Sequence, residues 1–185
     1  MAKTVASAKC VCIFAGARGK EYLFNDCAWL ATELVKTGWD IIYGGSSKGV
    51  MGSVCAAVKE AGGKITGVLP QKVYELNHYD KSIDMLVAQT MAGRKQHFWD
   101  RSDAFICLPG SYGSMDELFE VLTLTKLGYM PPKPIVIYNQ NGFYDPLIKL
   151  FSNMVQHGLM GEDRAELVKF VTTPWAAVDY VNGSH

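Results

Sequence analysis

The residues best suited to chemistry lie in the turn at residues 109–113, which reads Pro-Gly-Ser-Tyr-Gly. An apolar run of strand length at residues 105–108 precedes this turn, and a helical pattern follows it. Glycines let the backbone turn sharply and bring bare N–H groups close to a ligand. The N-terminus of a helix beside such a turn attracts phosphate or carboxylate groups. The pattern therefore indicates an anion site at the start of the helix.

The same residues also fit a plain turn from a strand into a helix. In that interpretation Ser111 or Ser114 caps the helix, and Glu117 stands three residues after Ser114, in the register of a capping box. The turn alone does not separate the two interpretations, so the rest of the chain has to decide between them.

Two more turns rich in glycine follow apolar runs, at residues 16–19 and 44–52. None of the three turns is a P-loop, because the pattern Gly-x-x-x-x-Gly-Lys-Ser/Thr is absent. The first turn also lacks the spacing Gly-x-Gly-x-x-Gly, which disfavours hydride transfer to a dinucleotide.

Hydrophobic periodicity and turn residues place these turns between strands and helices. The predicted strands cover residues 11–15, 39–45, 64–69, 83–88, 105–108, 135–138 and 167–171. The predicted helices cover residues 21–37, about 46–61, 91–101, 114–128 and 143–157, and a last helix begins at Pro174. Residues 71–81 are predicted to be irregular, and the proline-rich residues 130–134 to form an extended connector.

Strands that alternate with helices through short loops predict an α/β fold with an open parallel sheet and helices on both faces. No linker rich in Pro, Gly or Ser and no repeat divides the chain, so we expect a single domain over residues 1–185. Ligands of such sheets bind beyond the carboxyl ends of the strands, at the topological switch point. Three glycine turns at this edge favour a nucleotide-sized anionic ligand.

The composition excludes several classes of function. The 18 Lys and Arg residues balance 18 Asp and Glu residues, and no basic stripe with interleaved aromatic residues is present, which argues against nucleic acid as a partner. No apolar run approaches the roughly 18 residues of a membrane span, and the N-terminus lacks a signal pattern. We therefore expect a cytoplasmic protein without a membrane partner.

The cysteine and histidine residues predict no metal site. The five cysteines, at positions 10, 12, 27, 55 and 107, form no Cys-x-x-Cys pair, and their number is odd. Reduced thiols in the core of a cytosolic protein explain them better than a disulfide framework or a zinc site. His78 and His97 have no partner at ligand spacing, so both are interpreted as surface or capping residues.

Taken together, three motifs resemble the LOG ("Lonely Guy") family of cytokinin riboside 5'-monophosphate phosphoribohydrolases, which are often labelled lysine decarboxylases. The motifs are Gly-Gly-x-x-x-Gly-x-Met-Gly at residues 44–52, Arg94-Lys95, and Pro-Gly-x-Tyr-Gly-x-x-x-Glu at residues 109–117. The resemblance extends from residue 11 to about residue 178. It implies a Rossmann-like homodimer that needs no cofactor and releases a free base and ribose 5-phosphate from AMP or cytokinin riboside 5'-monophosphates.

The resemblance also implies roles for individual residues. Arg94 and Glu117 match the catalytic positions of the family. The positions implied to bind the nucleotide are Gly16, Gly45, Gly49, Gly52, Lys95, Gly110, Ser111, Tyr112, Gly113, Ser114, Asp116 and Thr123.

The chain departs from the usual family pattern at four places. Ser111 replaces a glycine, where a Cβ would be strained if φ were positive, and Ser114 replaces a threonine but keeps a hydroxyl. Residues 16–18 read Gly-Ala-Arg in place of Gly-Ser-Ser, which removes hydroxyls, adds a cation and changes the groups available to a phosphate. Residues 92–93 read Ala-Gly where His-Glu is common.

Cleavage of an N-glycosidic bond passes through a sugar of oxocarbenium character, which a carboxylate stabilises while it orients the attacking water. We expect Glu117 to do this, with membership of a capping box as the alternative. The guanidinium of Arg94 suits phosphate or the nitrogens of the departing base, with a solvated helix face as the alternative. Arg18 and Lys48 fit either a cation that binds phosphate or a solvated loop residue; for Lys48 we favour the loop residue. Tyr112 is interpreted as a packing residue, with a ring that lines the sugar pocket as the alternative.

The helix after the third turn is apolar around much of its circumference, and such a helix must be buried on more than one side. Contact with a second subunit or deep burial within one domain achieves this. The rival functions are a module that binds a nucleotide without turnover and a decarboxylase that uses pyridoxal phosphate. The decarboxylase is disfavoured because no context for a Schiff-base lysine is apparent.

Overall fold

The computed structural model describes residues 8–76, 79–161 and 167–183. The strands are β1 (Lys9–Phe14), β2 (Trp39–Tyr43), β3 (Ile65–Pro70), β4 (Asp84–Ala88), β5 (Ala104–Cys107), β6 (Ile135–Tyr138) and β7 (Lys169–Val171). The α-helices are α1 (Phe24–Lys36), α2 (Gly49–Glu60), α3 (Gln71–Tyr74), α4 (Met91–Arg101), α5 (Tyr112–Lys126), α6 (Asp145–Gln156) and α8 (Pro174–Val181). Two 3-10 turns, η1 (Glu21–Leu23) and η2 (Gln140–Gly142), complete the described elements.

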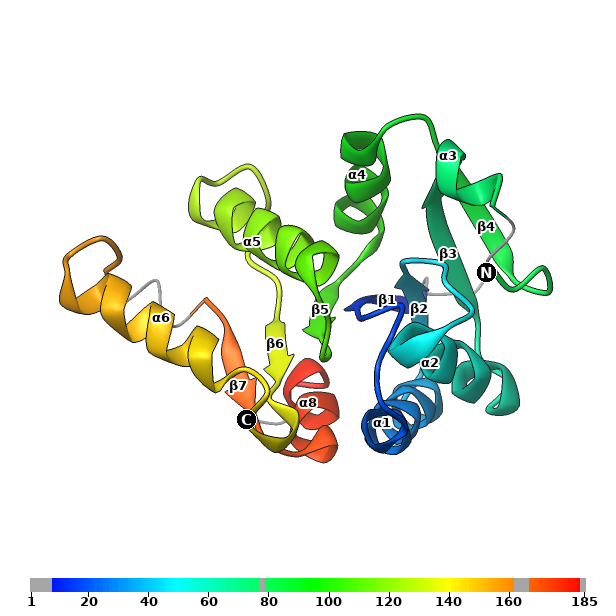
Figure 1. Ribbon diagram of the computed structural model, residues 1–185, viewed down its shortest axis with the longest axis horizontal. Helices are drawn as coiled ribbons and strands as arrows, with labels where there is room; N and C mark the ends of the chain where they lie inside the picture. Colours follow the sequence, from blue (N-terminus) through cyan, green and yellow to red (C-terminus); the bar gives the residue numbers. More distant parts are fainter. Residues whose placement is uncertain (1–7, 77–78, 162–166, 184–185) are drawn as a thin grey trace, which may run out of the picture.

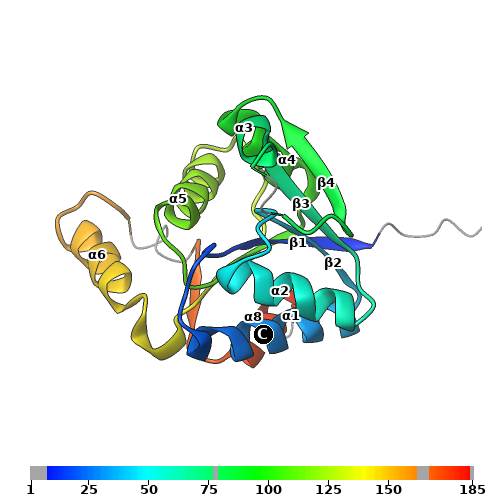
Figure 2. The same ribbon diagram turned by 45° about the vertical axis from the view of Figure 1, so that its right-hand side comes forward.

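All seven strands of the described sheet are parallel, in the order β4-β3-β2-β1-β5-β6-β7. Helices α1, α2 and α8 gather on one face, and α3, α4 and α5 on the other (Figures 1 and 2). The predicted open parallel sheet with helices on both faces is therefore confirmed. Every residue of β5 and β6 is buried, which explains why these strands are apolar without alternation.

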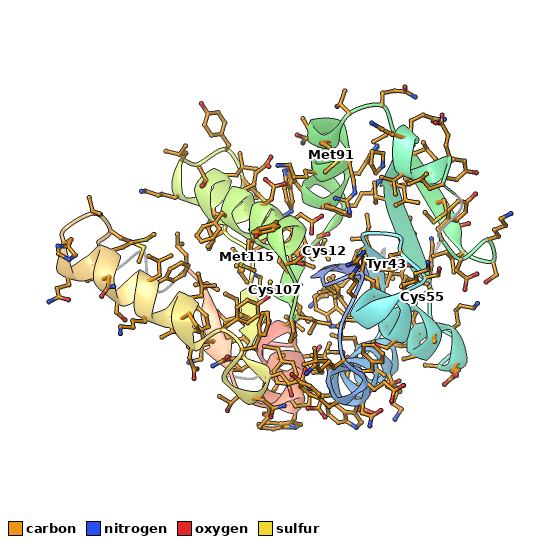
Figure 3. All side chains as sticks on the ribbon, in the orientation of Figure 1. Cys12, Tyr43, Cys55, Met91, Cys107 and Met115 are labelled. Atoms are coloured by element: carbon orange, nitrogen blue, oxygen red, sulfur yellow. The ribbon has the colours of Figure 1, made fainter. Side chains whose placement is uncertain are left out.

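Successive residues of the central strands pack into two separate cores. Val11 and Ile13 of β1 face the core beneath α1 and α2, whereas Cys12 and Phe14 face the core beneath α4 and α5. All five cysteines are free thiols, and all but Cys10 are buried, in agreement with the predicted core thiols. Cys12 and Cys107 lie in the central strands, and Cys55 of α2 lies beside Tyr43 (Figure 3).

The topological switch lies between β1 and β5. The chain proceeds outward from β1 to β4 and then returns to add β5 on the other side of β1, where Ile13 stands opposite Tyr43 on one side and Ile106 on the other. Consequently the turns that follow β1, β2 and β5 converge at one edge, as the sequence predicted.

Several predicted bounds are wrong. Residues 71–81 are not wholly irregular, because Pro70, in an extended conformation, is followed by the single helical turn α3. The predicted helix at 21–37 begins as the tighter turn η1, in which the Leu23 N–H bonds to the Lys20 carbonyl at 3.0 Å. Helix α5 begins at Tyr112, two residues before the expected start, and α6 and β7 begin two residues later than expected.

The structure describes no helix that is both long and apolar enough to cross a membrane in residues 8–76, 79–161 and 167–183. His97 is half-buried on α4, and His78 lies outside the described residues.

Candidate active site

A buried ion pair joins α4 to α5 at the carboxyl edge of the sheet, the edge formed by the C-terminal ends of the strands. The Nη1 atom of Arg94 lies 2.6 Å from Oε1 of Glu117, and the two side chains are only 11% and 7% exposed. The Nε–H of Arg94 donates to the carbonyl of Val68 in β3 at 2.9 Å, and its guanidinium lies 4.9 Å from the centre of the Phe98 ring. Arg94 is therefore held from three directions, and the interpretation of it as a solvated charge on a helix face is wrong.

The surroundings of Glu117 set its acidity. Burial, the largest cause, raises the pKa of the Glu117 carboxyl above its usual value, and the nearby Arg94 guanidinium opposes this rise. A buried carboxylate with a raised pKa is a stronger base than one in water, because solvent no longer stabilises its charge. The group is thus suited to accept a proton from a bound water.

The structure shows no capping box of Ser114 and Glu117 at the start of α5. Ser111 is the N-cap residue, with no hydrogen bond from its side chain to the helix, and its φ of −113° is an ordinary value. The expected strain at Ser111 is therefore absent. Ser114 lies inside the first turn and is buried, and Glu117 bonds to Arg94 instead of the helix start. A Cβ on Gly110 would overlap the Ser114 hydroxyl, so glycine is needed there for the close approach.

The three glycine turns are held together by backbone hydrogen bonds. The N–H of Gly16 donates to the carbonyl of Pro109 at 3.1 Å, which joins the turn after β1 to the turn after β5. The carbonyl of Gly16 accepts from the N–H of Met51 at 3.1 Å, which joins the first turn to the start of α2. The first turn is therefore clamped between the other two.

Two cavities open at this edge, one on each side of the first turn. The α4 cavity has a volume of about 480 Å³ and is lined by Ala17, Arg18, Gly44, Ser46, Lys48, Met51, Leu69, Pro70, Val73, Met91 and Arg94. The α5 cavity has a volume of about 530 Å³ and is lined by Gly16, Ala17, Arg18, Gly19, Leu23, Pro109, Gly110, Ser111, Tyr112 and Phe143. Both have the size of a site for a small organic ligand.

The predicted site residues fall into four groups, of which three lie at or beside the cavities. Arg94 lines the α4 cavity, with Glu117 bonded behind it, and Gly16, Gly110, Ser111 and Tyr112 line the α5 cavity. Tyr112 is 93% exposed, so its interpretation as a packing residue is wrong. The glycines at positions 49, 52 and 113 and Ser114 form the turns or the first helical turns beside these cavities.

The remaining predicted residues are not among the residues that line either cavity. Lys95 bonds to Asp116 at 3.1 Å and also pairs with Glu120, both on α5. Gly45 packs against Leu69 and Met85, side chains of β3 and β4.

Thr123 donates its hydroxyl to the carbonyl of Phe119 and lines a separate apolar cavity between α5 and α6. The structure does not bring Thr123 together with the Arg94–Glu117 pair.

The sequence alone did not reveal the apolar wall of the α4 cavity. Leu69, Val73, Met91 and Met51 supply it, from β3, α3, α4 and α2. Met51 belongs to a recognised motif, but Val73 lies in the segment predicted to be irregular. The sequence offered one signal, because Leu69 and Pro70 end a strand, and in a parallel sheet the carboxyl ends of the strands lie at the same edge as the switch point.

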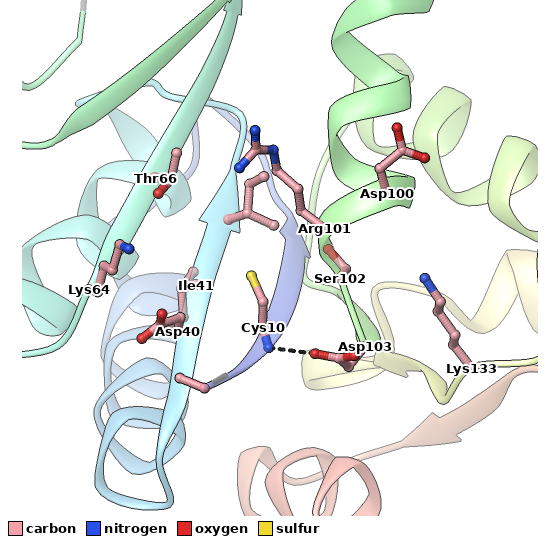
Figure 4. Close-up of a pocket in the computed structure, with 12 residues that line it drawn as sticks. Cys10, Asp40, Ile41, Lys64, Thr66, Asp100, Arg101, Ser102, Asp103 and Lys133 are labelled. Carbon is pink, nitrogen blue, oxygen red and sulfur yellow. Dashed lines mark hydrogen bonds between the residues drawn. The ribbon is translucent and has the colours of Figure 1, made fainter. Parts of the chain in front are cut away.

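A third cavity, of about 380 Å³, lies at the opposite edge of the sheet (Figure 4). It is lined by residues at or before the amino ends of the strands, such as Cys10, Asp40, Lys64 and Asp103. Burial, with Asp40 and Asp103 nearby, raises the pKa of the Cys10 thiol to about 12, which keeps the thiol protonated and unreactive. Because ligands of open α/β sheets bind beyond the carboxyl ends of the strands, this cavity at the amino ends is not taken as the candidate active site.

Comparison with known proteins identifies relatives over most of the chain. Residues 51–181 match a family model described as "Possible lysine decarboxylase". A probable cytokinin riboside 5'-monophosphate phosphoribohydrolase of Oryza sativa subsp. japonica is 36% identical over 169 residues, which cover 90% of this chain and 74% of the relative. A cytokinin riboside 5'-monophosphate phosphoribohydrolase of Arabidopsis thaliana is 33% identical over 171 residues, which cover 91% and 80% of the two chains.

Solved structures share the fold at lower identity. The molybdenum cofactor binding protein of Rippkaea orientalis superposes with a TM-score of 0.73 and 18% identity, over 98% of this chain and 99% of that one. The molybdenum cofactor carrier protein of Chlamydomonas reinhardtii gives a TM-score of 0.71 and 20% identity, over 95% and 97% of the two chains. At these identities the likeness concerns the fold alone.

Proposed function

Because the chain belongs to the LOG family of cytokinin riboside 5'-monophosphate phosphoribohydrolases, we propose that it hydrolyses the N-glycosidic bond of AMP or of cytokinin riboside 5'-monophosphates. Water adds to C1' of the ribose, the bond from C1' to the base nitrogen breaks, and the base leaves with a proton. The products are the free base and ribose 5-phosphate, and no cofactor takes part.

The observation that carries this proposal is the buried Arg94–Glu117 pair beside the α4 cavity. The Glu117 carboxylate stabilises the positive charge that develops on the ribose and accepts a proton from the attacking water. Arg94 keeps this carboxylate ionised and oriented, and Arg94 itself lines the α4 cavity.

The two ends of the nucleotide need different surroundings. Bare N–H groups at the start of α5, where Ser111 makes no side-chain cap, suit the phosphate. The apolar side chains of Met51, Leu69, Val73 and Met91 suit the flat, weakly polar face of a purine base. We therefore assign the phosphate to the start of α5 and the base to the α4 cavity.

Chemistry based on pyridoxal phosphate, which the description of the family model suggests, does not fit the lysines. A Schiff-base lysine is normally desolvated, and no lysine among residues 8–76, 79–161 and 167–183 is fully buried. Lys48, which lines the α4 cavity, is exposed on a loop, and Lys95 is engaged by two carboxylates.

We also propose that two copies of the chain associate and that the protein resides in the cytoplasm. One side of α5 is buried through Leu118 and Val121, while Phe119 and Leu122 are only partly covered and Leu127 is exposed. A second copy would cover these side chains. The free thiols support a reducing compartment. A titration that found fewer than five thiols in the denatured, unreduced protein would contradict that location.

Base release, followed by chromatography, tests the proposed reaction. AMP and isopentenyladenosine monophosphate are incubated with the wild-type protein and with Glu117→Gln, which keeps the size of the side chain but removes its charge. We expect free base from the wild type and at least about a hundredfold less from the variant. If the variant is as active as the wild type, Glu117 is not the catalytic carboxylate. If AMP raises the melting temperature but neither protein releases base, the chain is a nucleotide-binding module.

A further inference from the structure

Arg18 lies between the two cavities at the carboxyl edge of the sheet. It lies in the turn after β1 and lines both the α4 cavity and the α5 cavity. A side chain at this position can reach a ligand that extends from one cavity into the other.

The backbone that carries Arg18 is rigid. Gly16, two residues earlier, is bonded to Pro109 on one side and to Met51 on the other. Gly49 packs directly against the backbone of residues 17–18, in a left-handed conformation with φ of +62°, and a Cβ there would overlap the Arg18 nitrogen. The position from which the guanidinium projects is therefore fixed, although the side chain itself is exposed.

The charges around Arg18 are unbalanced. Among the described residues that line either cavity, none carries a carboxylate. Arg94 is already neutralised by Glu117, whereas Arg18 makes no ion pair or side-chain hydrogen bond with any other residue in the described part of the chain. In a chain with no net charge, Arg18 and Lys48 thus leave a local excess of positive charge. The N-terminus of α5 adds to it from the α5 cavity.

We propose that Arg18 is a specificity-determining residue, whose guanidinium binds the 5'-phosphate and so selects nucleotides over nucleosides. This inference rests on the proposed function. The planar fork of a guanidinium donates two parallel hydrogen bonds to a phosphate, which a lysine does not reproduce. The N–H groups at the start of α5 bind the same phosphate from the other side.

Three variants test the role of Arg18. Arg18→Ser removes the cation, Arg18→Lys keeps the charge without the fork, and Lys20→Ser removes the same charge from an exposed neighbour that lines neither cavity. The measurements are kcat and KM for base release from AMP and from adenosine, together with calorimetric binding of ribose 5-phosphate.

We expect Arg18→Ser to raise the KM for AMP by about 10- to 100-fold, the value of one or two charge-assisted hydrogen bonds. Its kcat for AMP and its activity on adenosine should stay within about threefold of the wild type. Arg18→Lys should be intermediate and Lys20→Ser unchanged. Equal KM values for AMP in Arg18→Ser and Lys20→Ser would overturn the role of Arg18 while leaving the proposed reaction intact.

The binding measurement separates the two proposals. If the wild type releases no base, the proposed reaction fails. Loss of ribose 5-phosphate binding in Arg18→Ser, but not in Lys20→Ser, would then still support Arg18 as the phosphate-binding residue. If the wild type neither releases base nor binds ribose 5-phosphate, both proposals are wrong.

Discussion

Replacement of Arg94 by alanine should destabilise the protein strongly, because it leaves the carboxylate of Glu117 buried without its partner. The Glu117 side chain is 7% exposed, so water cannot replace the lost guanidinium without a local rearrangement. The Val68 carbonyl loses its donor in the same step. Removing one partner of a buried ion pair costs about 3–5 kcal/mol. A typical domain has about 5–15 kcal/mol of stability in total, so the variant should fold but unfold at much lower urea concentration.

The loss of stability in Arg94→Ala should depend on pH. Burial already raises the pKa of Glu117, and removing Arg94 removes the first opposing charge, so the pKa rises further in the variant. A carboxyl whose pKa is higher in the folded than in the unfolded chain holds more protons when folded, so stability falls as the pH rises above the unfolded value. Arg94→Ala should therefore be least destabilised near the ordinary glutamate pKa of 4.5 and most destabilised at neutral pH.

Urea denaturation of four proteins measures this effect. The wild type, Arg94→Ala, Glu117→Gln and the double variant are compared at about pH 4.5 and about pH 7.5. The double variant lacks the carboxylate of residue 117, so it should recover part of the stability that Arg94→Ala loses at the higher pH. A loss of less than about 1 kcal/mol in Arg94→Ala, the value of an exposed pair, would show that burial does not strengthen this ion pair. Strict additivity of the two single losses would show that Arg94 and Glu117 do not interact.

Two further predictions concern α5. Burial lowers the pKa of Lys95, but the carboxylates of Glu120 and Asp116 more than offset this and raise it, so Lys95 stays charged and clamps α4 to α5. Lys95→Met should lower kcat for AMP by about tenfold with KM unchanged, whereas a raised KM alone would indicate that Lys95 binds the nucleotide directly. Light scattering of the purified protein should give the mass of two chains, and Leu127→Asp should lower it. A monomeric wild type would contradict the proposed association.

Much of the fold was predictable because its signals are local. The apolar runs of β5 and β6, the helical spacing of α1 and the glycines after β1, β2 and β5 each follow from the preferences of a few adjacent residues. The parallel arrangement followed from the alternation of strands and helices. Local preferences were ambiguous at helix starts, so a capping box of Ser114 and Glu117, the alternative to a catalytic role, had the correct spacing but does not form.

The identities of the candidate catalytic residues were also available from the sequence, since Arg94 and Glu117 belong to recognised motifs. The direct ion pair between the two side chains could not be predicted from the sequence. They are 23 residues apart on different helices, and each alone had an ordinary structural interpretation. The same spacing that indicated a cap for Glu117 also places it opposite Arg94, and only the packing of α4 against α5 decides between the two.

Local sequence was enough to predict most of the elements, the parallel sheet and the three turns, because these depend on residues close together in the chain. The tertiary structure decided the strand order, the burial of the Arg94–Glu117 pair and the engagement of Lys95 with α5 instead of the cavities. It also placed Thr123 away from that pair and Arg18 between two cavities. These features depend on which distant segments exclude water from one another, and that is settled only when the whole core packs.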